Sequence, residues 1–126
     1  MLTLGIESSC DETALALTHN NRVLASAIAS QIDMHQKWGG VVPEVAAREH
    51  LNHIHQLFSE VLKKANKSAH DIDLIAVTQG PGLIGALLVG VAFAKGLAGA
   101  LQKPLVPVNH VHAHLWGTFL DQSFDP

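Results

Sequence analysis

The sequence predicts an α/β fold in which a mixed β-sheet carries helices on its faces, with the element order β-β-β-α-β-α-β-α. Three features of the pattern lead to this prediction. Three short apolar segments separated by polar turns open the chain, and two long apolar segments with helical periodicity follow. A short apolar segment also precedes each of the last two helices.

The first thirty residues predict three antiparallel strands. Leu2 to Glu7 has the composition of a buried strand, and Ala14 to Thr18 and Val23 to Ser30 are expected to be the next two. Asn20-Asn21 can adopt the positive φ of a tight hairpin turn. The polar residues Ser8 to Glu12 are expected to form the loop between the first two strands.

A long amphipathic helix is predicted after a loop at Met34 to Val42. Pro43 suits the first position of a helix, because its missing N–H would have no partner there. Apolar residues then recur at spacings of three and four, at Leu51, Ile54, Phe58, Val61, Leu62 and Ala65. Glu60 and Lys64 lie one turn apart and should add about 0.2–0.5 kcal/mol.

The same helix contains His50, His53 and His55. Leu51 and Ile54 are expected to mark its buried side, between these histidines. We therefore interpret the three as solvated or hydrogen-bonded structural histidines, and not as metal ligands.

A strand at Leu74 to Thr78, a turn at Gly80-Pro81-Gly82 and a helix at Leu83 to Leu101 come next. Small residues at every fourth position predict close packing of this helix against a sheet or a second helix, at Gly82, Ala86, Gly90, Ala94 and Ala98. The stretch from Leu74 to Ala94 has no charged residue or histidine and approaches the length of a membrane span. Because the glycine turn interrupts it, a buried helix is expected. The turn amides could receive an anion, but a packing turn is the preferred interpretation.

A strand at Leu105 to Val108 and a helix starting near Asn109 complete the order. The order is that of ribonuclease-H-like, actin-type half-domains. The chain has 126 residues and a mass of 13.5 kDa, the usual size of one domain. Residues 1–126 are therefore predicted to form a single domain.

Composition excludes several classes of protein. A hydrophobic fraction of 48% and a charged fraction of 15% exclude disorder. The net charge is −3, and the one basic cluster, Lys63-Lys64-Lys67, is too small for a nucleic-acid footprint. No cationic segment precedes an apolar stretch at the N-terminus, so no signal peptide is expected. The single Cys10 excludes an intrachain disulfide and fits a reducing, cytoplasmic compartment.

The strongest candidate site is the segment Asn109-His110-Val111-His112-Ala113-His114. In a helix His110 and His114 lie on one face, and both imidazoles can reach one metal ion. His112 is rotated by roughly 200° from His110 and cannot share that face. The alternative is that both are ordinary surface histidines.

A zinc protease of the familiar kind is not expected, because its motif places a glutamate directly after the first histidine, where this chain has Val111. A structural or catalytic zinc site also needs three or four protein ligands. A third ligand must therefore come from elsewhere in the chain or from beyond Pro126.

The loop from Glu7 to Thr13 is the second candidate. Its hydroxyls and backbone amides could hold phosphate oxygens, and its carboxylates could hold Mg²⁺ or a water. A polar hairpin turn without a ligand is the alternative. Cys10 is not favoured as a nucleophile, because the two acidic residues beside it should make it a poorer thiolate.

Four motifs together resemble one protein family. They are Gly5-Ile6-Glu7-Ser8-Ser9-Cys10-Asp11-Glu12-Thr13, Gly39-Gly40-Val41-Val42-Pro43-Glu44, Gln79-Gly80-Pro81-Gly82-Leu83 and Val108 to His114, and they follow in the order of the family. The chain resembles the tRNA threonylcarbamoyladenosine transferases of the TsaD/Gcp type, formerly described as O-sialoglycoprotein endopeptidases. The resemblance implies an actin-like ATPase fold of two lobes, of which this chain would be the N-terminal one.

The resemblance also implies a reaction and its residues. The family transfers threonylcarbamoyl from its adenylate to the adenosine 3′ of the anticodon in tRNA. By position, His110 and His114 resemble its two histidine ligands for iron or zinc. Ser9 and Asp11 resemble the first loop on the phosphate side of the adenylate or ATP, and Glu12 would transfer a proton or position a water.

The implied partners are tRNA, a shorter non-catalytic paralogue and a small ATPase, with a homodimer as a further alternative and no membrane. Because this chain has no basic patch, tRNA binding is expected to be shared with the partners or the second lobe. The helices at 43–65 and 82–101 are the candidates for contact with the paralogue. Family members are much longer, and the third metal ligand is expected beyond Pro126, so the chain is expected to be inactive alone. Two other function classes stay open: a non-catalytic scaffold and, less favoured, a metallopeptidase.

Overall fold

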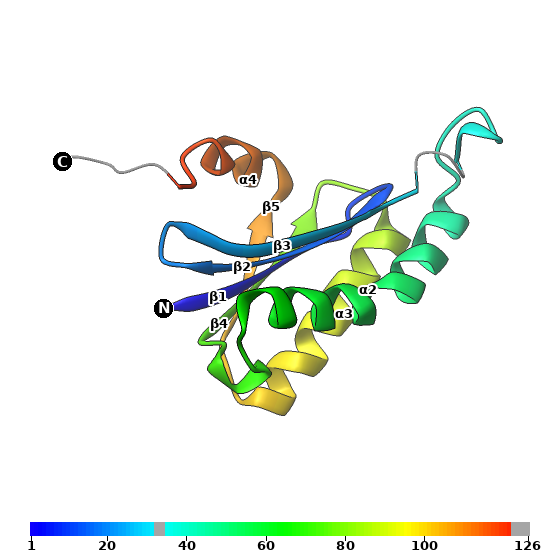
Figure 1. Cartoon of the computed structure of the whole chain (residues 1–126). Coiled ribbons are helices and arrows are strands. Elements are labelled where there is room, and N and C mark those ends of the chain that lie inside the picture. Colours follow the sequence, from blue (N-terminus) through cyan, green and yellow to red (C-terminus); the bar gives the residue numbers. More distant parts are fainter. Residues whose placement is uncertain (32–34, 122–126) are drawn as a thin grey trace.

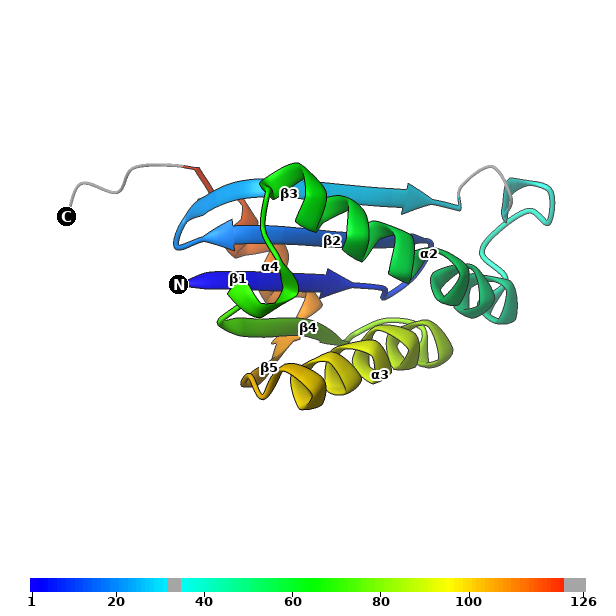
Figure 2. The same cartoon turned by 60° about the horizontal axis from the view of Figure 1, so that its bottom comes forward.

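The structure is a computed structural model that describes residues 1–31 and 35–121. Its sheet has five strands in the order β3-β2-β1-β4-β5. Helices α2 (Pro43–Ala65) and α3 (Ile84–Leu101) cover one face of the sheet, and α4 (His110–Gly117) lies on the other (Figures 1 and 2). The predicted α/β class and the element order β-β-β-α-β-α-β-α are confirmed.

The antiparallel half consists of β1 (Leu2–Glu7), β2 (Glu12–His19) and β3 (Arg22–Ser30). Asn20, with a φ of 54°, forms the predicted turn between β2 and β3. β2 begins at Glu12, two residues before the predicted start, because Glu12 and the next residue already pair with the end of β3.

The parallel half adds β4 (Leu74–Gly80) and β5 (Leu105–Asn109). β1 pairs with β4, β4 pairs with β5, and all three run in one direction. Their carboxyl ends therefore meet at one edge of the sheet. Along β1 the side chains of Leu2, Leu4 and Ile6 are buried under the helices, whereas Glu7 faces the opposite side.

The buried face of α2 consists of Ala46, His50, Ile54, Leu57 and Val61. Leu51 is 58% exposed, so the prediction that it marks the buried side is wrong. The face runs through His50 and Ile54, which are one turn apart, and Leu51 is rotated by about 100° from His50. The predicted pair of Glu60 and Lys64 is confirmed at 2.9 Å.

The small residues of α3 face inward, as predicted. A Cβ added at Gly90 would collide with Ser8 Oγ, next to the end of β1. Ser8 Oγ donates to the carbonyl oxygen of Ala86 at 2.8 Å and accepts from the backbone N–H of Gly90 at 3.2 Å. The row therefore packs within the protein. The outward face of α3 instead exposes Ile84 and Leu88, by 79% and 60%.

The predicted loop at Met34 to Val42 is wrong in part. His35 and Gln36 are helical, and Met34 lies outside the described residues. The His35 side chain, 3% exposed, orders this segment. Its Nδ1 accepts from the backbone N–H of Val42 at 3.1 Å, so its Nε2 donates to Gln31 Oε1 at 2.7 Å.

A short 3₁₀ helix, η1 (Ala69–Asp71), was not predicted, and a capping box between Ser68 and Asp71 stabilises it. Among the described helices, α3 alone is long and apolar enough to cross a membrane by length and composition. Buried core helices meet the same criterion, and α3 packs against α2, β1 and β4.

Candidate functional site

Glu7 lies at the carboxyl end of β1, and its carboxylate accepts hydrogen bonds from three separate parts of the chain. Glu7 Oε1 accepts from the backbone N–H of Ser9 at 2.5 Å. Glu7 Oε2 accepts from Thr78 Oγ1 at 2.7 Å and from His110 Nδ1 at 3.0 Å. Burial raises the pKa of this carboxyl, but the hydrogen bonds from Ser9, Thr78 and His110 outweigh burial, and the pKa lies below its usual value. Glu7 is therefore ionised at neutral pH and can accept all three bonds.

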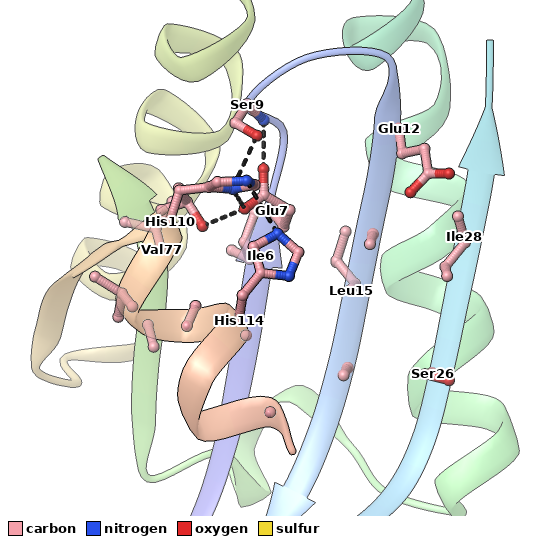
Figure 3. A pocket seen from close by; sticks show the side chains of 18 of the residues that line it. Ile6, Glu7, Ser9, Glu12, Leu15, Ser26, Ile28, Val77, His110 and His114 are labelled. Carbon is pink, nitrogen blue, oxygen red and sulfur yellow. Dashed lines mark hydrogen bonds and ion pairs between the residues drawn. The ribbon is translucent and has the colours of Figure 1, made fainter. Parts of the chain in front are cut away.

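Two histidines of α4, His110 and His114, point toward the same side of the cavity as Glu7 (Figure 3). Asn109 Oδ1 accepts from the backbone N–H groups of Val111 and His112, at 2.9 and 3.1 Å, and this cap fixes where the helix begins. His110 and His114 then lie one turn apart, with their Nε2 atoms 3.0 Å from each other (Figure 3). Their shared face is as predicted, and His112 is exposed.

The spacing of the two Nε2 atoms fits a metal ion. Two imidazoles bound to zinc at 2.0–2.1 Å in tetrahedral geometry have their nitrogens about 3.3 Å apart. The separation of 3.0 Å between His110 and His114 is close to this value, so a small shift of the rings would admit the ion. Within residues 1–31 and 35–121, no group of three or more His, Cys, Asp or Glu could hold a metal. The pair can therefore supply two ligands, and a complete centre needs at least one more.

The loop after β1 contributes one of its predicted residues directly to the histidine pair. Ser9 Oγ lies 3.2 Å from His110 Nδ1. Asp11 and Glu12 line the same cavity. Figure 3 shows Glu12 on the β2 side of that cavity, away from His110. The structure therefore brings Ser9 together with His110 and leaves Glu12 at another part of the cavity wall (Figure 3).

An open cavity of about 850 Å³ lies on the sheet face that carries α4. Its volume is in the range of small-molecule sites. Small side chains from the central strands form part of its wall, at Gly5, Ala14, Ala16 and Ala76. Its polar groups come from the loop and from α4, at Glu7, Ser9, Asp11, Glu12, His110 and His114.

The thiol of Cys10 is poorly suited to nucleophilic chemistry. Burial raises its pKa, and the charges of Asp11 and Glu7 raise it further. The thiol is therefore protonated at neutral pH, which agrees with the expectation that Cys10 is a poor thiolate.

The glycine turn before α3 packs directly against the Ser9 loop. The backbone N–H of Leu83 donates to the carbonyl oxygen of Ser9 at 2.8 Å. A Cβ added at Gly82 would lie 2.7 Å from both Cβ and the carbonyl oxygen of Ser9, so a larger residue would displace the loop. These contacts support the interpretation of Gly80-Pro81-Gly82 as a packing turn.

Two of the three α2 histidines, His50 and His53, are hydrogen-bonded within the protein, in agreement with the prediction. His50 is 0% exposed, and its ring nitrogens bond Thr13 Oγ1 at 2.6 Å and the carbonyl oxygen of Cys10 at 2.8 Å. His53 pairs with Glu49 one turn earlier at 3.1 Å. His50 thereby fastens the other side of the Ser8–Glu12 loop to α2.

Sequence reasoning missed the role of Glu7. Its partners Thr78 and His110 lie 71 and 103 residues away, so no local spacing could reveal them. One signal was present, because Glu7 is an acidic residue at the end of a largely apolar strand. The carboxyl ends of strands in parallel arrangements are common places for binding sites.

Comparison with known proteins gives a consistent result. A family model described as TsaD, tRNA N6-adenosine threonylcarbamoyltransferase, matches residues 22–126. Proteins of that name from Thermosipho melanesiensis and Fervidobacterium nodosum are 56% and 58% identical to the chain over 120 residues. These matches cover 95% of this chain but 37% and 36% of the two relatives. The chain thus spans little more than a third of the length of the curated relatives it matches.

Two solved structures share the fold. YeaZ from Pseudomonas aeruginosa superposes with a TM-score of 0.66 at 22% identity, over 86% of this chain and 45% of that one. Thermus thermophilus RuvC in complex with a Holliday junction substrate superposes with a TM-score of 0.56 at 15% identity, over 100% of this chain and 83% of that one. At these identities the likeness shows the fold alone, and it supports the ribonuclease-H-like, actin-type class.

Proposed function

The chain belongs to the TsaD family of tRNA N6-adenosine threonylcarbamoyltransferases, and we propose that it is the N-terminal lobe of such an enzyme. The proposed reaction moves threonylcarbamoyl from its adenylate to the adenosine 3′ of the anticodon in tRNA. One structural observation carries the proposal beyond family membership: the two Nε2 atoms of His110 and His114 converge at the wall of a cavity of ligand size.

The proposed resident metal is iron or zinc, held by His110 and His114. When bound, it would supply a Lewis acid and template for carbamoyl or phosphate oxygens. Ser9, whose hydroxyl lies beside His110, is proposed to hold phosphate oxygens of the adenylate or ATP together with Asp11 of the same loop. Glu12, exposed at the start of β2, is proposed to transfer a proton or position a water.

The histidine pair favours an enzyme lobe over a non-catalytic scaffold, because a scaffold has no need for two convergent metal ligands. A metallopeptidase is disfavoured further, since the side chain of Val111 cannot act as the general base of such enzymes. We also propose tRNA, a small ATPase and the cytoplasm as substrate, partner and compartment. The protonated Cys10 thiol is compatible with a reducing compartment.

The metal assignment is tested by anaerobic titration of the chain with Fe²⁺ and with Zn²⁺, followed by calorimetry. We expect one-to-one binding that the His110→Ala/His114→Ala variant loses. His53→Ala, which removes a histidine from α2, is the matched control and should leave binding unchanged. Absence of binding by the unaltered chain would refute a site that His110 and His114 form without a third ligand. Threonylcarbamoyl transfer by the 126-residue chain alone would refute the proposal that it is an inactive lobe.

The proposed contact with the non-catalytic paralogue is the outward face of α2 and α3. These helices pack side by side, and they expose Ile84 and Leu88 on α3 and Leu51 on α2. Exposed apolar side chains of this size, where they lie together, are typical of interaction sites. Gly90 cannot belong to this contact, because it faces Ser8 inside the protein.

Leu88→Asp should weaken pairing with the paralogue at least tenfold, because a carboxylate would be buried in an apolar contact. Calorimetry of the two purified proteins measures this affinity. Val106→Asp, on the edge strand β5, places the same charge at an exposed apolar position on another element. Equal weakening by both variants would contradict the assigned face.

A further inference from the structure

The position of the hydrogen on the His110 ring determines whether this histidine can bind a cation. A neutral imidazole carries its hydrogen on one nitrogen and offers a lone pair on the other. The Nε2 atom of His110 faces His114, so metal binding there requires the hydrogen to be on Nδ1. Whatever contacts Nδ1 therefore controls the metal site.

Within the described part of the chain, two groups contact His110 Nδ1, and they differ in the ring form that they require. The Ser9 hydroxyl at 3.2 Å can donate or accept and thus selects neither ring form. The Glu7 carboxylate at 3.0 Å can only accept, so it requires an N–H at Nδ1. Among the residues that the structure describes, Glu7 is thus the contact that fixes the form of the ring.

The carboxylate itself is held rigidly enough to do this. Glu7 receives the backbone N–H of Ser9 on Oε1 and the Thr78 hydroxyl on Oε2, from a loop and from β4. Thr78 is 5% exposed, and Glu7 is 31% exposed. Two donors on separate elements therefore orient the oxygen that faces His110 (Figure 3).

We propose that Glu7 is a positioning residue for the metal-ligand pair: its carboxylate keeps the hydrogen of His110 on Nδ1 and leaves the Nε2 lone pair directed toward a cation shared with His114. The assignment rests on the metal site of the proposed function. Groups that orient metal-binding histidines in this way contribute roughly 10–100-fold to metal affinity.

The substitution Glu7→Gln should reverse the form of the His110 ring, and not only weaken its hydrogen bond. The backbone N–H of Ser9 cannot turn away, so the amide oxygen of the glutamine should face it. The NH₂ group then faces Thr78, whose hydroxyl can rotate to accept, and His110 Nδ1. A donor at that place requires a lone pair on Nδ1, and the hydrogen of His110 should move to Nε2.

The experiment has two readouts on the 126-residue chain, at a pH where the histidines are neutral. Long-range nitrogen–proton NMR of the ring reports which nitrogen of His110 carries the hydrogen, without any metal. Zinc titration by calorimetry then reports affinity. We expect Nδ1–H in the unaltered chain, Nε2–H in Glu7→Gln, and zinc binding weaker by roughly 10–100-fold in the variant.

Two further variants keep the proposal testable if Glu7→Gln perturbs the fold. Thr78→Val removes one donor to Glu7 but leaves the carboxylate at His110, so the ring should keep Nδ1–H while zinc affinity falls by a smaller factor. Glu49→Gln alters the carboxylate that pairs with His53 on α2 and should change neither readout.

Retention of Nδ1–H together with unchanged zinc affinity in Glu7→Gln would overturn the proposal. If the hydrogen moves to Nε2 but even the unaltered chain binds no zinc, the control of the ring by Glu7 is confirmed and metal binding by this lobe alone is refuted. The two failures are therefore distinguishable.

Discussion

His50 and His110 contact the loop between β1 and β2 from different sides. They differ in how many of their ring nitrogens are bonded within the protein. His50 is fully buried, and both of its nitrogens are bonded within the fold, to Thr13 and to Cys10. His110 is 29% exposed, and the fold holds its Nδ1 while its Nε2 faces His114 at the cavity wall.

The two rings also require opposite forms. The carbonyl oxygen of Cys10 accepts only, so His50 carries its hydrogen on Nε2, whereas Glu7 requires the hydrogen of His110 on Nδ1. The difference teaches that a histidine whose nitrogens are both bonded within the fold contributes to stability. One whose second nitrogen faces a cavity is available for a ligand.

The largest expected effect on stability comes from removing the buried ring. His50→Ala should lower the free energy of unfolding by about 3 kcal/mol, because Thr13 and the Cys10 carbonyl lose their partner and a cavity remains. Urea unfolding followed by circular dichroism measures this change.

His114→Ala is the matching substitution at the cavity. It should change the free energy of unfolding by less than about 0.5 kcal/mol, as exposed substitutions usually do, although it removes a metal ligand. Similar losses of stability in His50→Ala and His114→Ala would contradict the distinction between the buried His50 and the histidines at the cavity.

A second effect concerns the helix that packs against the loop. Gly90→Ala should lower the free energy of unfolding by about 1–3 kcal/mol, because the new methyl group displaces Ser8 Oγ from its bonds to α3. Gly96→Ala on the same helix has nothing within 4 Å of the added Cβ and should raise stability by up to about 1 kcal/mol. Thermal unfolding of the two variants measures the direction of each change in stability. Stabilisation by both substitutions would contradict the close approach at Gly90.

The smallest expected effect is on the pH dependence of stability. Burial lowers the pKa of His50 below its ordinary value of 6.5. Below pH 6.5 the unfolded chain therefore binds a proton that the folded chain does not, and stability falls as the pH falls toward the folded pKa. Above pH 6.5 the contribution of His50 is complete. His50→Gln should show a flatter pH dependence in this window, and identical slopes would refute the role of His50.

Local pattern was sufficient for the strands and for the pair on α4. The apolar composition of β1 and the i,i+4 spacing of His110 and His114 depend on neighbouring residues, and the structure agrees with both. The helical turn at His35 was missed because its order depends on a bond from Val42, seven residues away. Leu51 was assigned to the wrong face because an apolar residue can also lie on an outward surface.

The centre of the candidate site was beyond local reasoning. Glu7 gains its role from Thr78 and His110, which only the parallel pairing of β1, β4 and β5 brings near. The inward direction of Gly90 similarly follows from Ser8, whose hydroxyl bonds the α3 backbone. Spacing predicted that a close approach would occur, but the tertiary structure determined what approaches.

The central place of β1 in the sheet also affects the order in which the sheet can form during synthesis. β1 can pair with β2 as soon as the first hairpin emerges from the ribosome, but its other edge must wait for β4, and Glu7 must wait for His110, 103 residues later. At roughly 5–20 residues per second, that interval during synthesis is on the order of 5–20 s. An unpaired strand edge is prone to pairing with other chains. The strand that carries Glu7 is thus also exposed to mispairing until β4 has been made.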